Sequence, residues 1–236
     1  MTVLVSVWGA APGVGKSTLC AGLSRSLAGA GLRVDHFREE EVLTRPQFAA
    51  VAGEFEAKGA VGLETLAAAA ACFAESVVAR GDEVVIADAL VPFVPTLLAM
   101  GHGAETIDAF TAGLTSVLAR VRPVVVFLDG DAGVALSRAA EREGPEWLER
   151  YVGKLAAYGV SPRVTDLASA VTYLRRERAV TLGAVRQPGW GLVVVERAPE
   201  LSPDEVLRVV RQGLKPWLGD AGATAPSAAR PSPPST

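Results

Sequence analysis

The chain has 236 residues, half of them hydrophobic and about a fifth charged, which suits one globular domain with a sizeable core. Its net charge is −3 with both signs interspersed, which excludes the basic footprint of a protein that binds nucleic acid or an anionic membrane surface. Only two cysteines occur, no basic leader is visible, and no apolar run approaches the roughly 20 residues that span a bilayer. We therefore expect a cytoplasmic protein whose partner is a small molecule.

Apolar, β-branched runs alternate with helical patterns along the chain. The predicted strands are residues 3–8, 32–37, 83–88, 124–129 and 191–196. The predicted helices are residues 18–30, 62–79, 107–120, 133–143, 146–158, 166–178 and a last helix capped by Ser202. This alternation predicts an α/β fold, with a mainly parallel sheet between two layers of helices and with ligands at the carboxyl ends of the strands. We expect one domain over residues 1–218 and a disordered Ala/Pro/Ser-rich tail over residues 219–236.

The turn between the first strand and the first helix is rich in glycine and precedes a lysine and a serine. It resembles the phosphate-loop pattern G-x-x-x-x-G-K-[ST], called Walker A, with Ala10 in place of the first glycine. Backbone N–H groups of such a loop point at phosphate oxygens, while Lys16 would neutralise the β- and γ-phosphates and Ser17 would ligate Mg²⁺. We therefore expect ATP and Mg²⁺ as cofactors, with GTP as the other possible donor. The residues predicted to bind the nucleotide are Ala11, Pro12, Gly13, Val14, Gly15, Lys16, Ser17 and Thr18.

Two strands end in a carboxylate. Asp88 closes the third strand, where it would lie beside the glycine-rich turn and hold a water of Mg²⁺ or an acceptor hydroxyl. The alternative for Asp88 is a turn cap. Asp129 ends the fourth strand, but Gly130 and Asp131 follow it as turn formers, so a structural role is favoured there and Asp129 is a reserve candidate.

Charged and aromatic residues follow the second and third strands. Glu39 at the sheet edge is a candidate to accept the proton of an acceptor hydroxyl, and Arg38 to orient an anionic group, although a solvated loop is the alternative for both. Phe48 and Phe93 are candidates to stack on a planar acceptor, with core packing as the more frequent use of such rings.

Arg138 and Arg142 lie four residues apart and so project from one face of a predicted helix. Guanidinium groups there would close over the phosphates, stabilise the transferring phosphoryl group and exclude water. An exposed, salt-bridged helix is the alternative. We expect a short lid over about residues 133–160.

The order of these parts resembles the thymidylate kinase and deoxynucleoside kinase group of P-loop kinases, over about residues 3–215. Where that family has an Arg-Glu-Pro motif, this chain has Arg38-Glu39-Glu40, and where the family has an Asp-Arg pair, it has Asp88-Ala89. The family's Arg-Pro before the fourth strand is matched by Arg122-Pro123, and the Asp at the end of that strand by Asp129. Arg138 and Arg142 resemble the family's lid arginines. The resemblance implies a P-loop NTPase fold with a five-stranded parallel core, ATP as donor, Mg²⁺, and often a homodimer. Ala89 replaces the arginine that helps to hold a substrate phosphate, which favours an uncharged hydroxyl acceptor.

The leading hypothesis is an ATP-dependent phosphotransferase that moves the γ-phosphoryl group to a nucleoside, a nucleotide or a similar small acceptor. Its predicted catalytic residues are Lys16, Asp88, Glu39, Arg138 and Arg142, with Ser17 and Asp88 at the metal. A kinase for a sugar-like or antibiotic-like alcohol stays open, as does a nucleotide-dependent switch ATPase that acts on a protein partner. A ligase similar to dethiobiotin synthetase is a weaker alternative, because glutamates stand where that enzyme has a lysine after its second strand.

Overall fold

The computed structural model describes residues 1–9, 11–88, 90–158 and 160–219. Its centre is a five-stranded sheet in the order β2-β3-β1-β4-β5, and every pair of neighbouring strands is parallel. The strands are β1 (Val3–Gly9), β2 (Val34–Phe37), β3 (Val84–Asp88), β4 (Arg122–Leu128) and β5 (Gly191–Val195). The predicted α/β class, with five parallel strands flanked by helices, is confirmed.

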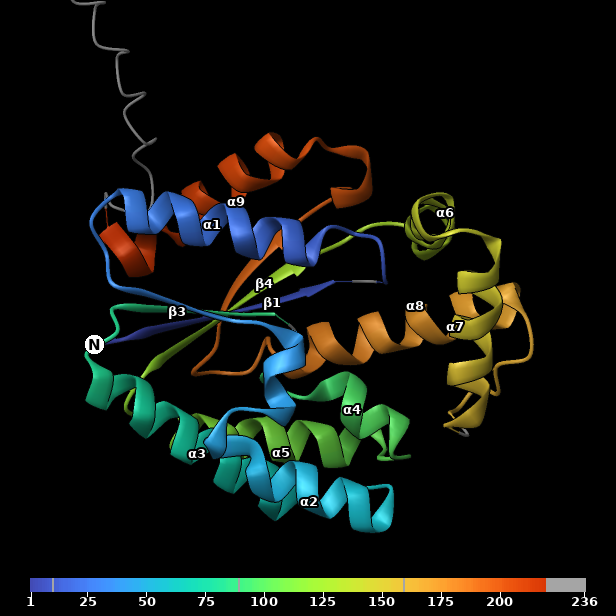
Figure 1. The fold of residues 1–236 in the computed structure, drawn as a ribbon, viewed down its shortest axis with the longest axis horizontal. Helices are drawn as coiled ribbons and strands as arrows, with labels where there is room; N and C mark the ends of the chain where they lie inside the picture. The colour runs from blue at the N-terminus through green and yellow to red at the C-terminus, as the bar shows by residue number, and fades with distance from the viewer. Residues whose placement is uncertain (10, 89, 159, 220–236) are drawn as a thin grey trace, which may run out of the picture.

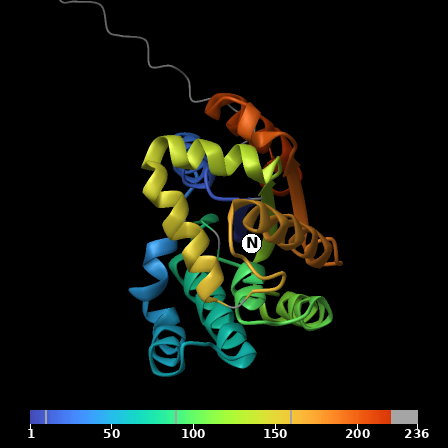
Figure 2. The same cartoon turned by 90° about the vertical axis from the view of Figure 1, so that its right-hand side faces the viewer.

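Helices cover both faces of the sheet (Figure 1). The longer helices are α1 (Lys16–Gly29), α2 (Ala49–Lys58), α3 (Leu63–Arg80), α4 (Val94–Ala99), α5 (Ala104–Val117), α6 (Ala132–Glu143), α7 (Pro145–Ala157), α8 (Leu167–Ala184) and α9 (Pro203–Leu218). Short 3-10 turns are η1 (Glu39–Leu43), η2 (Pro46–Phe48) and η3 (Ala198–Glu200). Helices α1 and α9 lie on one face, whereas α2, α3, α4 and α5 lie on the other. Figure 2 shows α6 and α7 following one another at the end of the molecule that carries the carboxyl ends of the strands.

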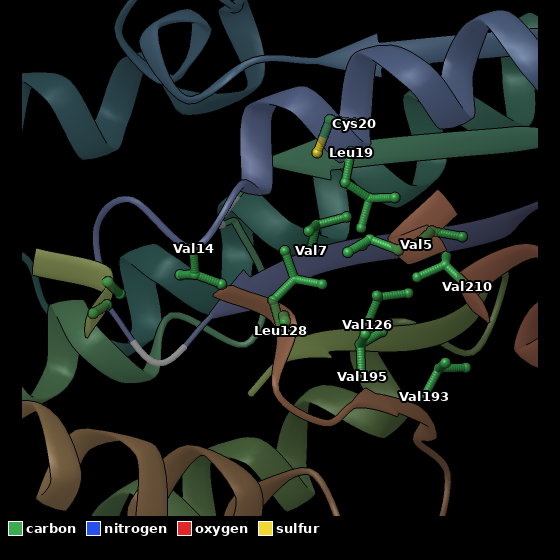
Figure 3. Close-up of a cluster of buried hydrophobic side chains, with 14 of the residues drawn as sticks. Val5, Val7, Val14, Leu19, Cys20, Val126, Leu128, Val193, Val195 and Val210 are labelled. Atoms are coloured by element: carbon green, nitrogen blue, oxygen red, sulfur yellow. The ribbon is translucent and has the colours of Figure 1, made fainter. Parts of the chain in front are cut away.

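The core forms because successive residues of each buried strand point to opposite faces of the sheet. Val5 and Val7 of β1 pack with Leu19, Cys20 and Val210 of α1 and α9, as Figure 3 shows. On the other face, Leu4 packs against α3 and α5, and Trp8 packs against the end of α8. Apolar side chains are therefore favoured along β1, with Ser6 as a buried polar exception, because neither face of this strand reaches water.

Several elements differ from the sequence prediction: β2 begins at Val34 rather than residue 32, and α5 spans Ala104–Val117 rather than residues 107–120. Helix α8 extends six residues beyond the predicted end at Arg178, because Leu182 packs with Trp8 and Phe127 under the sheet. Helices α2 and α4 were not predicted, since α2 buries only Val51 and α4 has six residues, too few to show a periodic pattern. Strand β4 begins at Arg122, two residues earlier than predicted.

Some predictions fall on positions that the structure does not describe. Ala10, Ala89 and residues 220–236 of the predicted tail lie outside the described residues. Among the residues that are described, no helix has both the length and the apolar character needed to cross a bilayer.

Candidate functional site

The loop between β1 and α1 is held in a tight curve by its glycines. Gly13 and Gly15 have φ angles of 85° and 101°, a region that is costly for residues with a side chain. Val14 between them is buried in the core and fixes the loop to the sheet. Helix α1 begins directly afterwards at Lys16 and has no acidic residue in its first turn. The positive end of the helix dipole is therefore uncompensated by side chains of this turn, which suits an anion.

Asp88, at the carboxyl end of β3, lies beside the start of α1. The Ser17 hydroxyl donates a hydrogen bond of 2.7 Å to Asp88 Oδ2. The Asp88 side chain is buried, and its Oδ1 atom has no hydrogen-bond partner among the described residues. A buried carboxylate oxygen without a partner is costly unless a cation or a water completes its shell. Mg²⁺ is held by only one or two side-chain oxygens in nucleotide sites, and a serine hydroxyl beside a carboxylate offers oxygens of this kind.

Helix α6 packs directly on the β1–α1 loop. A Cβ atom on Gly13 would come within 2.3 Å of the carbonyl oxygen of Ala135, so the two backbones are in contact. This contact brings Arg138 and Arg142 of α6 to the loop. The Arg138 guanidinium donates to the carbonyl of Pro199, and Arg142 Nε donates to Glu143 at 2.8 Å.

A cleft of about 100 Å³ lies between these parts of the molecule. Its polar side includes the loop glycines, Thr18, Arg138 and Arg142. Its apolar side includes Ala198 and Leu201 of the β5–α9 connection and Pro203 and Val206 of α9. Residues of the β1–α1 loop, two arginines and an apolar wall therefore meet in one cleft. Such a combination suits a ligand with both an anionic and a flat apolar part.

Arg38 and Glu39 lie at the same edge of the sheet but are exposed. The register pairs Phe37 of β2 with Ala87 of β3, so Arg38 follows β2 at the level where Asp88 ends β3. Nearby Arg45 binds Asp35 at 2.6 Å and Glu41 at 2.7 Å, which fixes the turn after β2. The edge location predicted for Arg38 and Glu39 is thus observed, and their chemical roles stay predictions.

The two aromatic candidates lie in the core. Phe48 is 1% exposed and packs against Phe37 and Phe73 at centroid distances of 5.5 and 5.7 Å. Phe93 is 6% exposed and contacts Phe110 at 6.5 Å. Since both rings are covered by other side chains, the burial favours the packing role over stacking on an acceptor.

Asp129, the reserve candidate, is tied to helix α8. Arg178 donates to both oxygens of its buried carboxylate, and the Gly130 N–H donates to Oδ1 at 2.8 Å. Burial alone would raise the pKa of Asp129, but the Arg178 guanidinium outweighs it and holds that pKa below the usual range. This pairing favours the structural role, in which Asp129 anchors α8 to the end of β4.

Glu177 of α8 is a residue with a shifted pKa that the sequence analysis did not single out. Burial raises its pKa to about 7, while a hydrogen bond from Tyr173 and the charge of Lys16 act in the opposite direction. A signal was present in the sequence: Ala170, Tyr173, Glu177 and Thr181 recur at helical spacing, and the other three are buried. A glutamate on the buried face of a helix is unusual and marks a candidate site.

Comparison of the chain with models of known protein families gives no match. A search among characterised proteins gives no significant match either.

Proposed function

We propose that this protein is an ATP-dependent phosphotransferase with a P-loop NTPase fold. The observation that carries the proposal is the hydrogen bond between Ser17 and Asp88, at the start of the helix that follows a positive-φ glycine loop. Strand β1 supplies the loop, and the neighbouring strand β3 supplies the carboxylate. A hydroxyl and a carboxylate joined beside a helix start are suited to a nucleotide with its metal ion.

Different residues of the site bind different parts of ATP. The backbone N–H groups of the β1–α1 loop face the phosphates, and Lys16 neutralises the β- and γ-phosphates. Ser17 and Asp88 would hold Mg²⁺, which would neutralise charge on the phosphate oxygens. The apolar wall of the cleft at Leu201 and Pro203 accommodates the base, and Arg138 and Arg142 close over the phosphates from α6.

Phosphoryl transfer then depends mainly on position and charge. In-line transfer needs an acceptor hydroxyl held against the γ-phosphate, together with cations that stabilise the charge spread over its oxygens. Arg138 and Arg142 supply that charge from a helix packed on the loop. The acceptor enters from the β2 and β3 side of the sheet edge, where Arg38 and Glu39 lie, and is a nucleoside, a nucleotide or another small alcohol.

The experiment is a transfer assay with γ-labelled ATP, Mg²⁺ and a panel of nucleosides, nucleotides and alcohol-bearing metabolites. Wild-type protein is expected to label one class of acceptor. Ser17→Ala is expected to lose most of this transfer because the metal loses its hydroxyl ligand. Ser116→Ala, an exposed serine on α5, is the matched control and is expected to behave as wild type. ATP consumption that rises only with a protein partner, and never with a small acceptor, would contradict the proposal and favour a switch ATPase.

A further inference from the structure

The apolar wall of the cleft beside the β1–α1 loop bears on which nucleotide the protein binds. Four residues with hydrocarbon side chains form this wall, namely Ala198, Leu201, Pro203 and Val206. Ala198 and Val206 are buried, and Leu201 packs against the same core cluster. A hydrocarbon surface binds a flat ring through the apolar area that it removes from water, and this area depends little on the polar groups at the edge of the ring.

The wall is fixed to the end of the sheet by backbone contacts. The Ala198 N–H donates to the Asp129 carbonyl at 2.7 Å, and the Asp129 N–H donates to the Val195 carbonyl at 2.9 Å. A Cβ atom on Gly130 would lie 2.3 Å from Pro199 Cδ, so the chain after β4 is in direct contact with η3. The wall therefore presents a fixed surface to the cleft.

The backbone donors of the wall are engaged within the protein. Besides the Ala198 N–H, the Leu201 N–H donates to the Ala198 carbonyl at 3.2 Å, and the Val206 N–H donates to the Ser202 carbonyl at 3.0 Å. Pro203 has no N–H group. Each N–H group of these four residues thus has a partner inside the protein before a base binds.

Two backbone carbonyls of η3 are engaged as well. Adenine and guanine differ at position 6, where adenine carries an amino donor and guanine a carbonyl acceptor. A free backbone carbonyl would favour adenine, and a free N–H would favour guanine. The Pro199 carbonyl accepts from the Arg138 guanidinium, and the Ala198 carbonyl accepts from the Leu201 N–H. Recognition of adenine by these carbonyls would have to compete with existing hydrogen bonds.

The cleft is also too small to enclose a whole nucleotide. Its volume is about 100 Å³, whereas pockets that enclose a small molecule have about 300 to 1,000 Å³. A base that packs on the wall therefore keeps its polar edge in water. Water donates and accepts hydrogen bonds equally well, so it satisfies adenine and guanine alike.

We infer that the nucleotide site holds either purine, so that both ATP and GTP act as phosphoryl donors, and this inference rests on the proposed function. A pocket built to hydrogen-bond its ligand rejects the wrong one by roughly 10⁴-fold, whereas a hydrophobic pocket discriminates by only about 100-fold or less. Affinity then comes from the triphosphate, which the β1–α1 loop and the arginines of α6 bind, and from the apolar area of the ring.

The first test is calorimetry with Mg²⁺ and three ligands: ATP, GTP and ribose 5-triphosphate, which lacks the base. We expect the dissociation constants of ATP and GTP to agree within about tenfold. Ribose 5-triphosphate should bind about tenfold more weakly than either, because it cannot bury apolar area on the wall. A larger preference for one purine, or ribose 5-triphosphate binding as tightly as ATP, would overturn the inference.

The second test compares three leucine variants. Leu201→Ala should weaken ATP and GTP by the same factor of about five and leave ribose 5-triphosphate unchanged, which also shows that the variant is folded. Leu201→Met keeps the apolar area and should bind as wild type does. Leu167→Ala, at an exposed leucine of α8, is the matched control and should also bind as wild type does. A changed ratio of ATP to GTP affinity in Leu201→Ala, or no loss of either, would overturn the inference.

The outcomes separate this inference from the proposed function. If ATP binds and GTP binds more than about tenfold more weakly, the inference is wrong while the proposed function stands. If none of the three ligands binds to wild-type protein, the proposed function itself fails. In the transfer assay, γ-labelled GTP is expected to label the same acceptor as γ-labelled ATP, and labelling from ATP alone would overturn the inference.

Discussion

Substituting Gly13 by alanine tests the contact between the β1–α1 loop and helix α6. The new Cβ would lie 2.3 Å from the carbonyl oxygen of Ala135 and 3.0 Å from the Cβ of Ala139. The φ of 85° adds a cost of about 1 kcal/mol for a residue with a side chain. Overpacking against backbone that cannot give way adds about 2 kcal/mol. We therefore expect Gly13→Ala to lower the free energy of unfolding by about 3 kcal/mol.

Gly15→Ala is the matched control on the same loop. Its φ is 101°, but a Cβ there would meet no atom within 4 Å, so only the conformational cost of about 1 kcal/mol applies. In thermal unfolding, a domain of this size should lose about 9 °C in Gly13→Ala and about 3 °C in Gly15→Ala. Urea unfolding gives the free energies directly. Equal losses in the two variants would refute the claim that the loop packs on α6.

Three further predictions concern stability. Ser202→Ala should destabilise the protein by about 1 kcal/mol in urea unfolding, because the hydroxyl that caps α9 at the Glu205 N–H is lost. Asp129→Asn should cost about 2 kcal/mol, because the Arg178 guanidinium loses its buried partner. Glu177→Gln should stabilise the protein above pH 7. The raised pKa makes the free energy of unfolding of the wild type fall as pH increases from about 4.5 to about 7. The variant should therefore be roughly 3 kcal/mol more stable than the wild type at pH 8, and equally stable at pH 4.

Each of these predictions has a clear contrary result. A change below about 0.3 kcal/mol for Ser202→Ala would show that the cap is replaced by water. Full stability of Asp129→Asn would show that the ion pair does not anchor α8. A pH-independent difference between Glu177→Gln and wild type would contradict the raised pKa of this carboxyl.

The sequence predicted the parts of the site that local patterns define. A buried apolar run followed by Gly13, Gly15 and Lys16 predicts a strand, a curved loop and a helix, and these elements are found in that order. The strand-end carboxylate Asp88 was also predicted from its place after an apolar run. Its hydrogen bond to Ser17 depends on β3 lying next to β1, a strand order that is seen only in the folded sheet.

The features that the sequence did not predict depend on contacts between segments that are far apart in the chain. Glu177 is 161 positions from Lys16 in the chain, so their interaction appears only once α8 is folded against the sheet edge. Phe48 is a similar case, because the sequence places it after β2 but does not reveal that Phe73 of α3 covers its ring. Helix α8 was predicted too short for the same reason, since its last turns pack under Trp8 of β1.

Calorimetric binding of ATP in the presence of Mg²⁺ tests the central claim most directly. Wild-type protein is expected to bind ATP at one site, and Lys16→Ala to bind roughly 30-fold more weakly, because an ammonium that contacts phosphate oxygens contributes about 2 kcal/mol. Lys58→Ala removes an exposed lysine on α2 and should bind as wild type does. Equal affinity of Lys16→Ala and wild type, or no binding by wild type, would contradict the account of the β1–α1 loop as a nucleotide site.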